Sequence, residues 1–177
     1  SKDIILHESE TPRKDAFQFS KKTGAHLIST STDDHCLSGY SQIAKELPKD
    51  IEAVFVPASS GALAVGLFQG YKKNAVPHFF ITQTPRVHSL VALDVDESEI
   101  TSKSSMADAI SDVVGARKDQ VHEVIRRTVG AGVVVEDRFI NNAMKILVKQ
   151  LKITNPSPNG ALAFAGFLKV FGRAEFP

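Results

Sequence analysis

The sequence predicts an α/β fold in three layers, with a mostly parallel sheet flanked by helices. Five short apolar runs have the character of strands, namely residues 3–7, 25–29, 54–56, 79–83 and 133–135. Segments with apolar residues at helical spacing alternate with these runs. The alternation is typical of a parallel sheet, because parallel neighbours are joined by crossover connections that are usually helices. Ligands of such sheets bind at the carboxyl ends of the strands, where the small residues after Pro57 fall.

Length and composition indicate one globular unit. A chain of 177 residues buries roughly 70% of its unfolded surface on folding. The formal net charge is +1 and the 21 basic residues are scattered, so we expect no nucleic-acid partner. No apolar run approaches the ~18 residues of a membrane span, and no signal peptide opens the sequence. We therefore expect no membrane association and a cytoplasmic location.

Caps and breakers mark the helices. The first helix is predicted to begin at Pro12 after a Thr11 cap, and to end near Gly24. A capping cluster at residues 31–34 precedes a second, amphipathic helix, which Pro48 ends. Further helices are predicted over 119–129 and after the acidic pair at 136 and 137, and the polar stretch 95–105 is predicted as a surface loop.

Residues 54–72 form the junction that points most directly to function. A strand-like run stops at Pro57, small residues follow, and an apolar helical pattern begins. The first turn of a helix has N–H groups without internal partners, and the helix dipole adds partial positive charge, so this turn is suited to a phosphate or carboxylate. The alternative is an ordinary turn with Ser60 as the helix cap. The spacing alone slightly favours that alternative.

The same junction resembles the phosphate-binding loop of the fold-type II pyridoxal-phosphate enzymes, which include threonine synthase, threonine and serine dehydratases and cysteine synthase. The matching positions are Val56, Pro57, Gly61, Leu63 and Gly66. The resemblance implies pyridoxal phosphate as cofactor, with its phosphate held by Ser59, Ser60, Gly61, Ala62 and Leu63. Gln83 matches the end of the family's next strand, and residues 155–168 resemble its closing loop and Ala-rich helix.

The resemblance covers nearly all of this chain but only about the latter half of a family member. Residues 1–30 resemble the tail of the small domain, and residues 31–177 resemble most of the large domain. The family's Schiff-base lysine, in a Ser-x-Lys context, and its Ser-Thr-Gly-Asn substrate loop have no match here, so we expect no catalytic residue in this chain. Ser157 is the nearest candidate to meet the cofactor's ring nitrogen, although a solvated loop serine is the simpler interpretation.

The function implied by the resemblance is that of the C-terminal portion of a threonine-synthase-like or dehydratase-like enzyme of amino-acid metabolism. Its substrate would be a small-molecule amino acid. The alternative is a non-catalytic truncated or degenerate module used for binding or assembly. In either case we expect self-association as a homo-oligomer or docking to another chain, because half of a two-part fold exposes apolar surface.

Other candidate motifs do not indicate a second chemistry. The six histidines show no paired ligand spacing on one helix, and Cys36 has no cysteine partner, so no metal site is expected. Cys36, although it is next to His35, is predicted to be a buried structural cysteine. The glycines at 130 and 132 precede their strand, whereas a dinucleotide fingerprint follows its strand.

Overall fold

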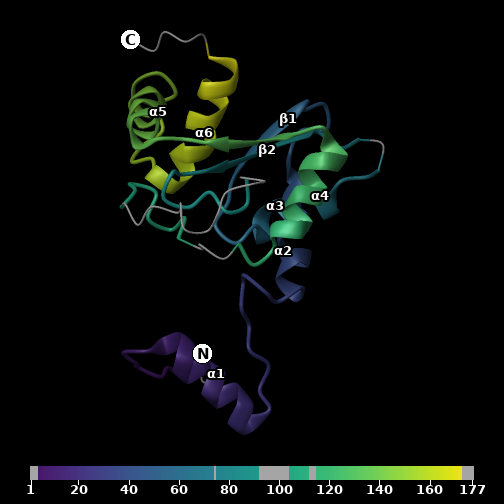
Figure 1. Cartoon of the computed structure of the whole chain (residues 1–177), viewed down its shortest axis with the longest axis vertical. Helices are drawn as coiled ribbons and strands as arrows, with labels where there is room; N and C mark the ends of the chain where they lie inside the picture. Colours follow the sequence, from purple (N-terminus) through teal and green to yellow (C-terminus); the bar gives the residue numbers. More distant parts are fainter. Residues whose placement is uncertain (1–3, 74, 92–103, 112–114, 173–177) are drawn as a thin grey trace.

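The computed structural model describes residues 4–73, 75–91, 104–111 and 115–172, and its centre is a parallel sheet of three strands (Figure 1). The strands are β1 (Ala53–Pro57), β2 (His78–Gln83) and β3 (Ala131–Val134), in that order across the sheet. Val56 lies opposite Ile81, and Ile81 lies opposite Gly132. The strands predicted at 54–56, 79–83 and 133–135 are confirmed, with β3 beginning two residues early because Ala131 already pairs with Phe80 of β2.

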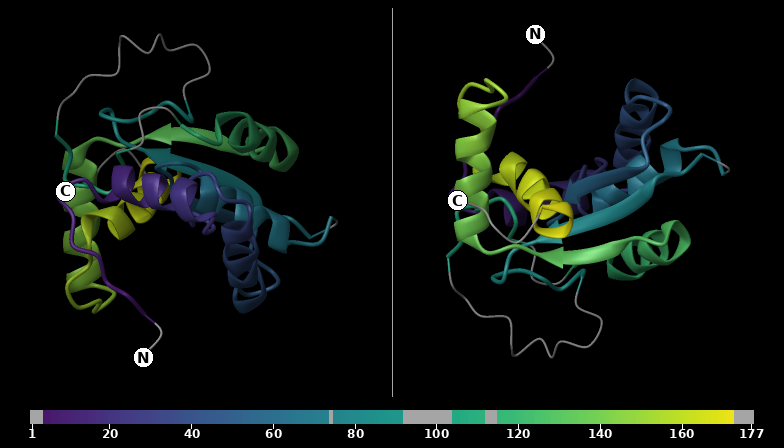
Figure 2. Two further views of the ribbon diagram at one scale, coloured as in Figure 1. Left: turned by 90° about the horizontal axis from the view of Figure 1, so that it is seen from below. Right: turned by 90° about the horizontal axis from the view of Figure 1, so that it is seen from above.

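Helices cover both faces of the sheet, as the predicted three-layer fold requires. Helices α2 (His35–Glu46), α3 (Ala62–Gly70) and α4 (Lys118–Thr128) supply one apolar core, together with Val56, Phe79 and Ile81 of the sheet. Helices α5 (Asp137–Lys149) and α6 (Pro158–Phe171) supply a second core on the other face, around Val133. In both views of Figure 2, α5 and α6 lie together toward one side of the molecule, and α2 and α4 lie toward the other.

The helix α1 (Pro12–Thr23) lies apart from the sheet and has no buried residue (Figure 1). Pro12 occupies its first turn, and Gly24 ends it in the left-handed conformation with a φ of 73°, as the sequence predicts. The side chain of Thr11 makes no capping bond; instead, the hydroxyl of Ser9 accepts from the Thr11 N–H at 2.9 Å.

The strands predicted at 3–7 and 25–29 are wrong for the residues that the structure describes. Residues 4–7 and 25–29 are irregular, and residue 3 lies outside the described part of the chain. Ile5, Leu6 and Ile28 are 79%, 89% and 73% exposed. A run of strand-like residues becomes a strand only when a neighbour accepts and donates its backbone hydrogen bonds. The described residues pair no strand with either run.

The other helical predictions are confirmed. Helix α2 ends immediately before Leu47 and Pro48, and α4 and α5 occupy the predicted stretches. Most of the predicted loop at 95–105 lies outside the described residues. In the described part of the chain, no helix combines the length and the apolar character that crossing a bilayer would need.

Two glycines allow α2 and α3 to pack closely. A Cβ at Gly66 would lie 2.6 Å from the Cβ of Tyr40, and one at Gly70 would lie 2.2 Å from the backbone oxygen of Ser41. Neither distance is a tolerable contact between real atoms. Helix α3 can therefore lie this close to α2 only because residues 66 and 70 have no side chain.

We expect Gly70→Ala to destabilise the chain by about 1–3 kcal/mol, because the new methyl group meets backbone that cannot rotate away. The matched control is Gly39→Ala in the middle of α2, where an added Cβ has no neighbour within 4 Å. That control should stabilise by about 0.5–1 kcal/mol, since alanine is the better helix former. Urea unfolding of both variants measures the difference, and equal midpoints would contradict this account of the interface.

Candidate functional site

The turn between β1 and α3 brings the five predicted phosphate-binding residues together. The N–H of Ala58 donates to the backbone oxygen of Thr82 at 3.0 Å, which extends the sheet by one residue beyond Pro57. Gly61 then adopts a φ of 91° and precedes the first residue of α3. A Cβ there would lie 2.5 Å from Val121 of α4. Both the backbone conformation and the packing of this turn therefore require glycine.

No side chain caps α3. Gly61 occupies the cap position and has no side chain with which to accept, so the alternative of a Ser60 cap is wrong. The first hydrogen bond of the helix runs from the N–H of Val65 to the oxygen of Gly61 at 3.0 Å. The N–H groups of the preceding residues, Ala62 and Leu63 among them, are left pointing out of the helix end with the positive end of its dipole.

A small hollow lies at this helix end. Its volume is about 170 Å³. Its lining contains all five predicted residues together with residues from β1, α2 and two other segments, namely Thr30, Tyr40, Pro57, Ala58, Ser59, Ser60, Gly61, Ala62, Leu63 and Ile110. The donors in this hollow are backbone N–H groups and hydroxyls, which is the set that an anion needs.

The side chain of Gln83 holds the turn after β1 in place through two hydrogen bonds. It is fully buried; its Nε2 donates to the backbone oxygen of Ala58 at 3.0 Å, and its Oε1 accepts from the N–H of Leu90 at 2.9 Å. The neighbouring Thr82 hydroxyl donates to the oxygen of Val56 at 3.2 Å. The sequence marks Gln83 only through the family resemblance. A glutamine at the end of a strand-like run is the feature of the sequence from which this buried role could have been predicted.

Residues 104–111 support the turn from the side. The N–H of Ser111 donates to the Ser59 hydroxyl at 3.1 Å, so this serine is engaged by the protein itself. The segment is held in turn by Asn159 of α6, whose side chain accepts from Ala109 and donates to Asp108 at 3.1 and 3.0 Å. The bond from Asn159 lowers the pKa of Asp108. The sequence carries no local sign of these contacts.

In the structure, Ser157 acts as the cap of α6. Its hydroxyl accepts from the N–H of Gly160 at 3.1 Å and so caps α6, with Pro158 at the first helical position. It is not among the residues that line the hollow at the start of α3. A contact between Ser157 and the ring nitrogen of the cofactor stays a prediction.

Arg117 joins the start of α4 to two segments that flank the hollow. Its side chain is 4% exposed, its Nε donates to the oxygen of Ser31 at 2.9 Å, and its Nη1 donates to Asp34 at 2.8 Å. Its own backbone N–H donates to the oxygen of Ser60 at 3.2 Å. A buried guanidinium with fixed partners is a positioning group, and no pattern in the sequence indicates this role for Arg117. Cys36, expected to be buried, is partly exposed.

The fold and this turn define a class, that of α/β proteins in which a helix without a side-chain cap starts at the carboxyl edge of a parallel sheet. Comparison with known proteins narrows the class. The sequence profile of the family described as "Pyridoxal-phosphate dependent enzyme" matches residues 2–177. The chain therefore belongs to this family, whose members use pyridoxal phosphate.

Individual relatives agree with this assignment. The L-threonine dehydratase catabolic TdcB of Staphylococcus aureus is 27% identical over 157 residues, which cover 85% of this chain and 44% of that protein. The serine racemase of Oryza sativa subsp. indica is 25% identical over 179 residues, covering 94% and 49%. The chain spans about half the length of the curated relatives it matches.

Solved structures share the fold. The processed form of threonine deaminase isoform 2 from Solanum lycopersicum superposes with a TM-score of 0.70 at 22% identity, over 93% of this chain and 47% of that one. The serine racemase of Dictyostelium discoideum gives a TM-score of 0.67 at 20% identity, over 93% and 53%. These likenesses confirm the predicted fold class.

We expect Gln83→Leu to destabilise the chain by about 2–4 kcal/mol, because the oxygen of Ala58 and the N–H of Leu90 would be buried without partners. The matched control is Gln42→Leu on the exposed side of α2, where little change is expected. Chemical denaturation measures both variants. A stability of Gln83→Leu within experimental error of the control would show that the turn does not depend on this side chain.

Proposed function

We propose that the turn from Ser59 to Leu63 binds the phosphate group of pyridoxal phosphate. The observation that carries the proposal is the uncapped start of α3, which opens onto a hollow whose lining includes all five residues that the family resemblance assigns to phosphate. Membership of the pyridoxal-phosphate family also supports it. The donor set fits the group, since a phosphate is an acceptor and the hollow offers N–H and O–H donors.

Each part of the turn has a separate task in this proposal. The N–H groups of Ala62 and Leu63 donate to the phosphate, and the helix dipole favours its negative charge. Gly61 lets the chain turn into α3 close to Val121, while Gln83 and Arg117 fix the backbone on either side. Pyridoxal phosphate, when bound, supplies the electron sink that elimination, replacement and racemisation of amino acids need.

We also propose that the chain is part of an enzyme acting on a small amino acid, of the threonine dehydratase or threonine synthase type. The names of the relatives support the dehydratase branch and also include racemases. In this proposal residues 1–30 are the tail of a small domain and residues 31–177 most of a large domain, and the protein is a homo-oligomer. The exposed side chains of Ile5, Leu6 and Ile28 support a covering partner.

The second candidate function is a binding or assembly module without catalysis. It is favoured by one observation: none of the described residues that line the hollow is a lysine. The covalent step of this family needs a lysine amine beside the cofactor. Both candidates share the phosphate site, and they differ in whether a lysine from elsewhere reaches it.

We expect Ser60→Asp to lower the affinity for pyridoxal phosphate at least tenfold. A carboxylate at the mouth of the hollow repels the phosphate, and two like charges about 4–5 Å apart near a protein surface interact by well over the 1.4 kcal/mol that a factor of ten represents. The fold should persist, because an acidic residue just before α3 interacts favourably with the helix dipole. Equilibrium titration by cofactor fluorescence measures the affinity.

The matched control is Ser38→Asp, which adds the same charge on an exposed position of α2. It should bind pyridoxal phosphate as the wild type does. The wild type should bind pyridoxal, which lacks the phosphate, more weakly than it binds pyridoxal phosphate. The affinities of the two variants for pyridoxal should differ little. Equal affinities of Ser60→Asp and Ser38→Asp for pyridoxal phosphate would overturn the proposed site.

A further inference from the structure

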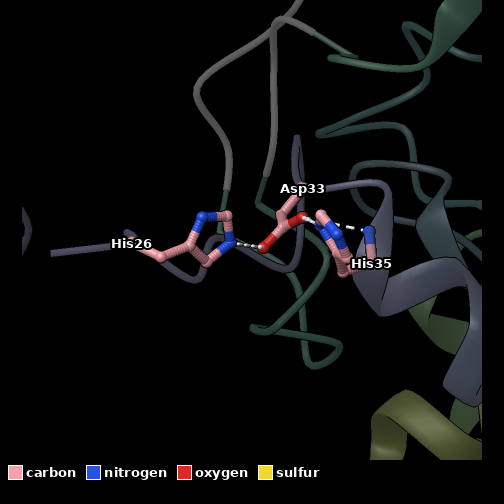
Figure 3. A group of neighbouring side chains, drawn as sticks. All are labelled: His26, Asp33 and His35. Carbon is pink, nitrogen blue, oxygen red and sulfur yellow. Dashed lines mark hydrogen bonds and ion pairs between the residues drawn. The ribbon is translucent and has the colours of Figure 1, made fainter.

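A second cluster of polar side chains lies where the segment after α1 meets α2 (Figure 3). His26 comes from the irregular stretch that follows α1, Asp33 from the next turn, and His35 is the first residue of α2. The Nε2 of His26 lies 2.7 Å from one carboxylate oxygen of Asp33, and the Nδ1 of His35 lies 2.9 Å from the other. If one such nitrogen or oxygen atom is taken from each of the three residues, the three atoms all lie within 4.8 Å of one another.

The backbone of the turn creates this geometry. The N–H groups of Thr32 and Asp33 both donate to the oxygen of Ser29, at 3.1 and 2.8 Å, which turns the chain back toward His26. The N–H of His35 donates to the Asp33 carboxylate at 3.0 Å. The residues are seven and two positions apart along the chain, so a search for paired ligands on one helix does not find them.

The carboxylate and the imidazoles differ in exposure. The side chain of Asp33 is 7% exposed, whereas those of His26 and His35 are 63% and 87% exposed. The hydrogen bond from His26, followed by those from the backbone and the ring of His35, lowers the pKa of Asp33 to about 2. The cluster therefore consists of one fixed, ionised carboxylate and two imidazoles that can adjust around it.

We propose that His26, Asp33 and His35 bind one divalent transition-metal ion of the zinc class. Two imidazoles and one carboxylate form a ligand set that zinc accepts, with bonds of about 2.0–2.2 Å and a fourth position left for water. Ligand atoms around a tetrahedral ion of that size are about 3.4 Å apart. The two contacts to Asp33, of 2.7 and 2.9 Å, need to open by about 0.5–0.7 Å to reach this separation. Both imidazole rings that make these contacts are exposed.

The ion would act as a structural clip. It joins the stretch that carries α1 to the first turn of α2, and so replaces two exposed hydrogen bonds with metal bonds. The same turn contains Thr30, which lines the phosphate hollow, and Asp34, which pairs with Arg117. A bound ion therefore restrains one wall of the hollow, but the site stands on its own geometry and does not depend on the proposed phosphate binding.

The test is calorimetric titration of the chain with zinc chloride after treatment with EDTA. The wild type should bind one zinc ion per chain, and His26→Ala and His35→Ala should each weaken binding at least tenfold. Both imidazoles are exposed, so neither change should unfold the protein. The control is His88→Ala, whose ring bonds only to the oxygen of Pro85 among the contacts described and lies outside the cluster. It should leave zinc binding unchanged.

A second measurement identifies the ligand atoms. Long-range ¹H–¹⁵N spectra of the imidazoles should show zinc on the Nε2 of His26 and on the Nδ1 of His35, with the other rings unaffected. The proposal is overturned if the wild type binds zinc no more tightly than the double variant lacking both imidazoles, or if the spectra place the ion on other histidines.

Discussion

The hydrogen bonds that hold Ala58 at the end of β1 are the constraint on which the candidate site depends. Its N–H is bonded to Thr82 and its oxygen to the buried amide of Gln83, so the chain leaves the sheet in one fixed direction. Gly61 then turns into α3 with a φ that other residues rarely adopt. With these two points fixed, the first turn of α3 opens at the carboxyl edge of the sheet, where parallel α/β folds bind ligands.

The remaining walls of the hollow come from distant parts of the chain. Ser111 bonds to Ser59, Arg117 bonds to Ser60 and to Ser31, and α6 holds the segment that carries Ile110. These contacts tie both cores to one turn. A site assembled in this way positions backbone donors before any ligand arrives, which is what makes N–H groups effective partners for an anion.

The sequence was informative where the relevant physics is local. A glycine before an apolar helix and a glycine at the end of α1 each have a conformational cause within a few residues, and the structure has them as predicted. The strand expected to stop at Pro57 instead includes Pro57, and its hydrogen bonding continues to Ala58. The strands predicted at 3–7 and 25–29 failed because pairing is not local. The bond between Ser59 and Ser111 joins residues 52 positions apart, and that between Arg117 and Ser31 spans 86. The cluster around Asp33 depends on a turn that no spacing rule for helices describes.

The central claim is that backbone N–H groups at the start of α3 hold a phosphate. Amide ¹H–¹⁵N spectra of the chain, recorded during titration with inorganic phosphate, test it most directly because each donor is observed separately. The account predicts that the largest and saturable shifts occur at residues 59–64, with Ala62 and Leu63 among them. Saturable shifts confined to other parts of the chain, with these amides unmoved, would contradict it.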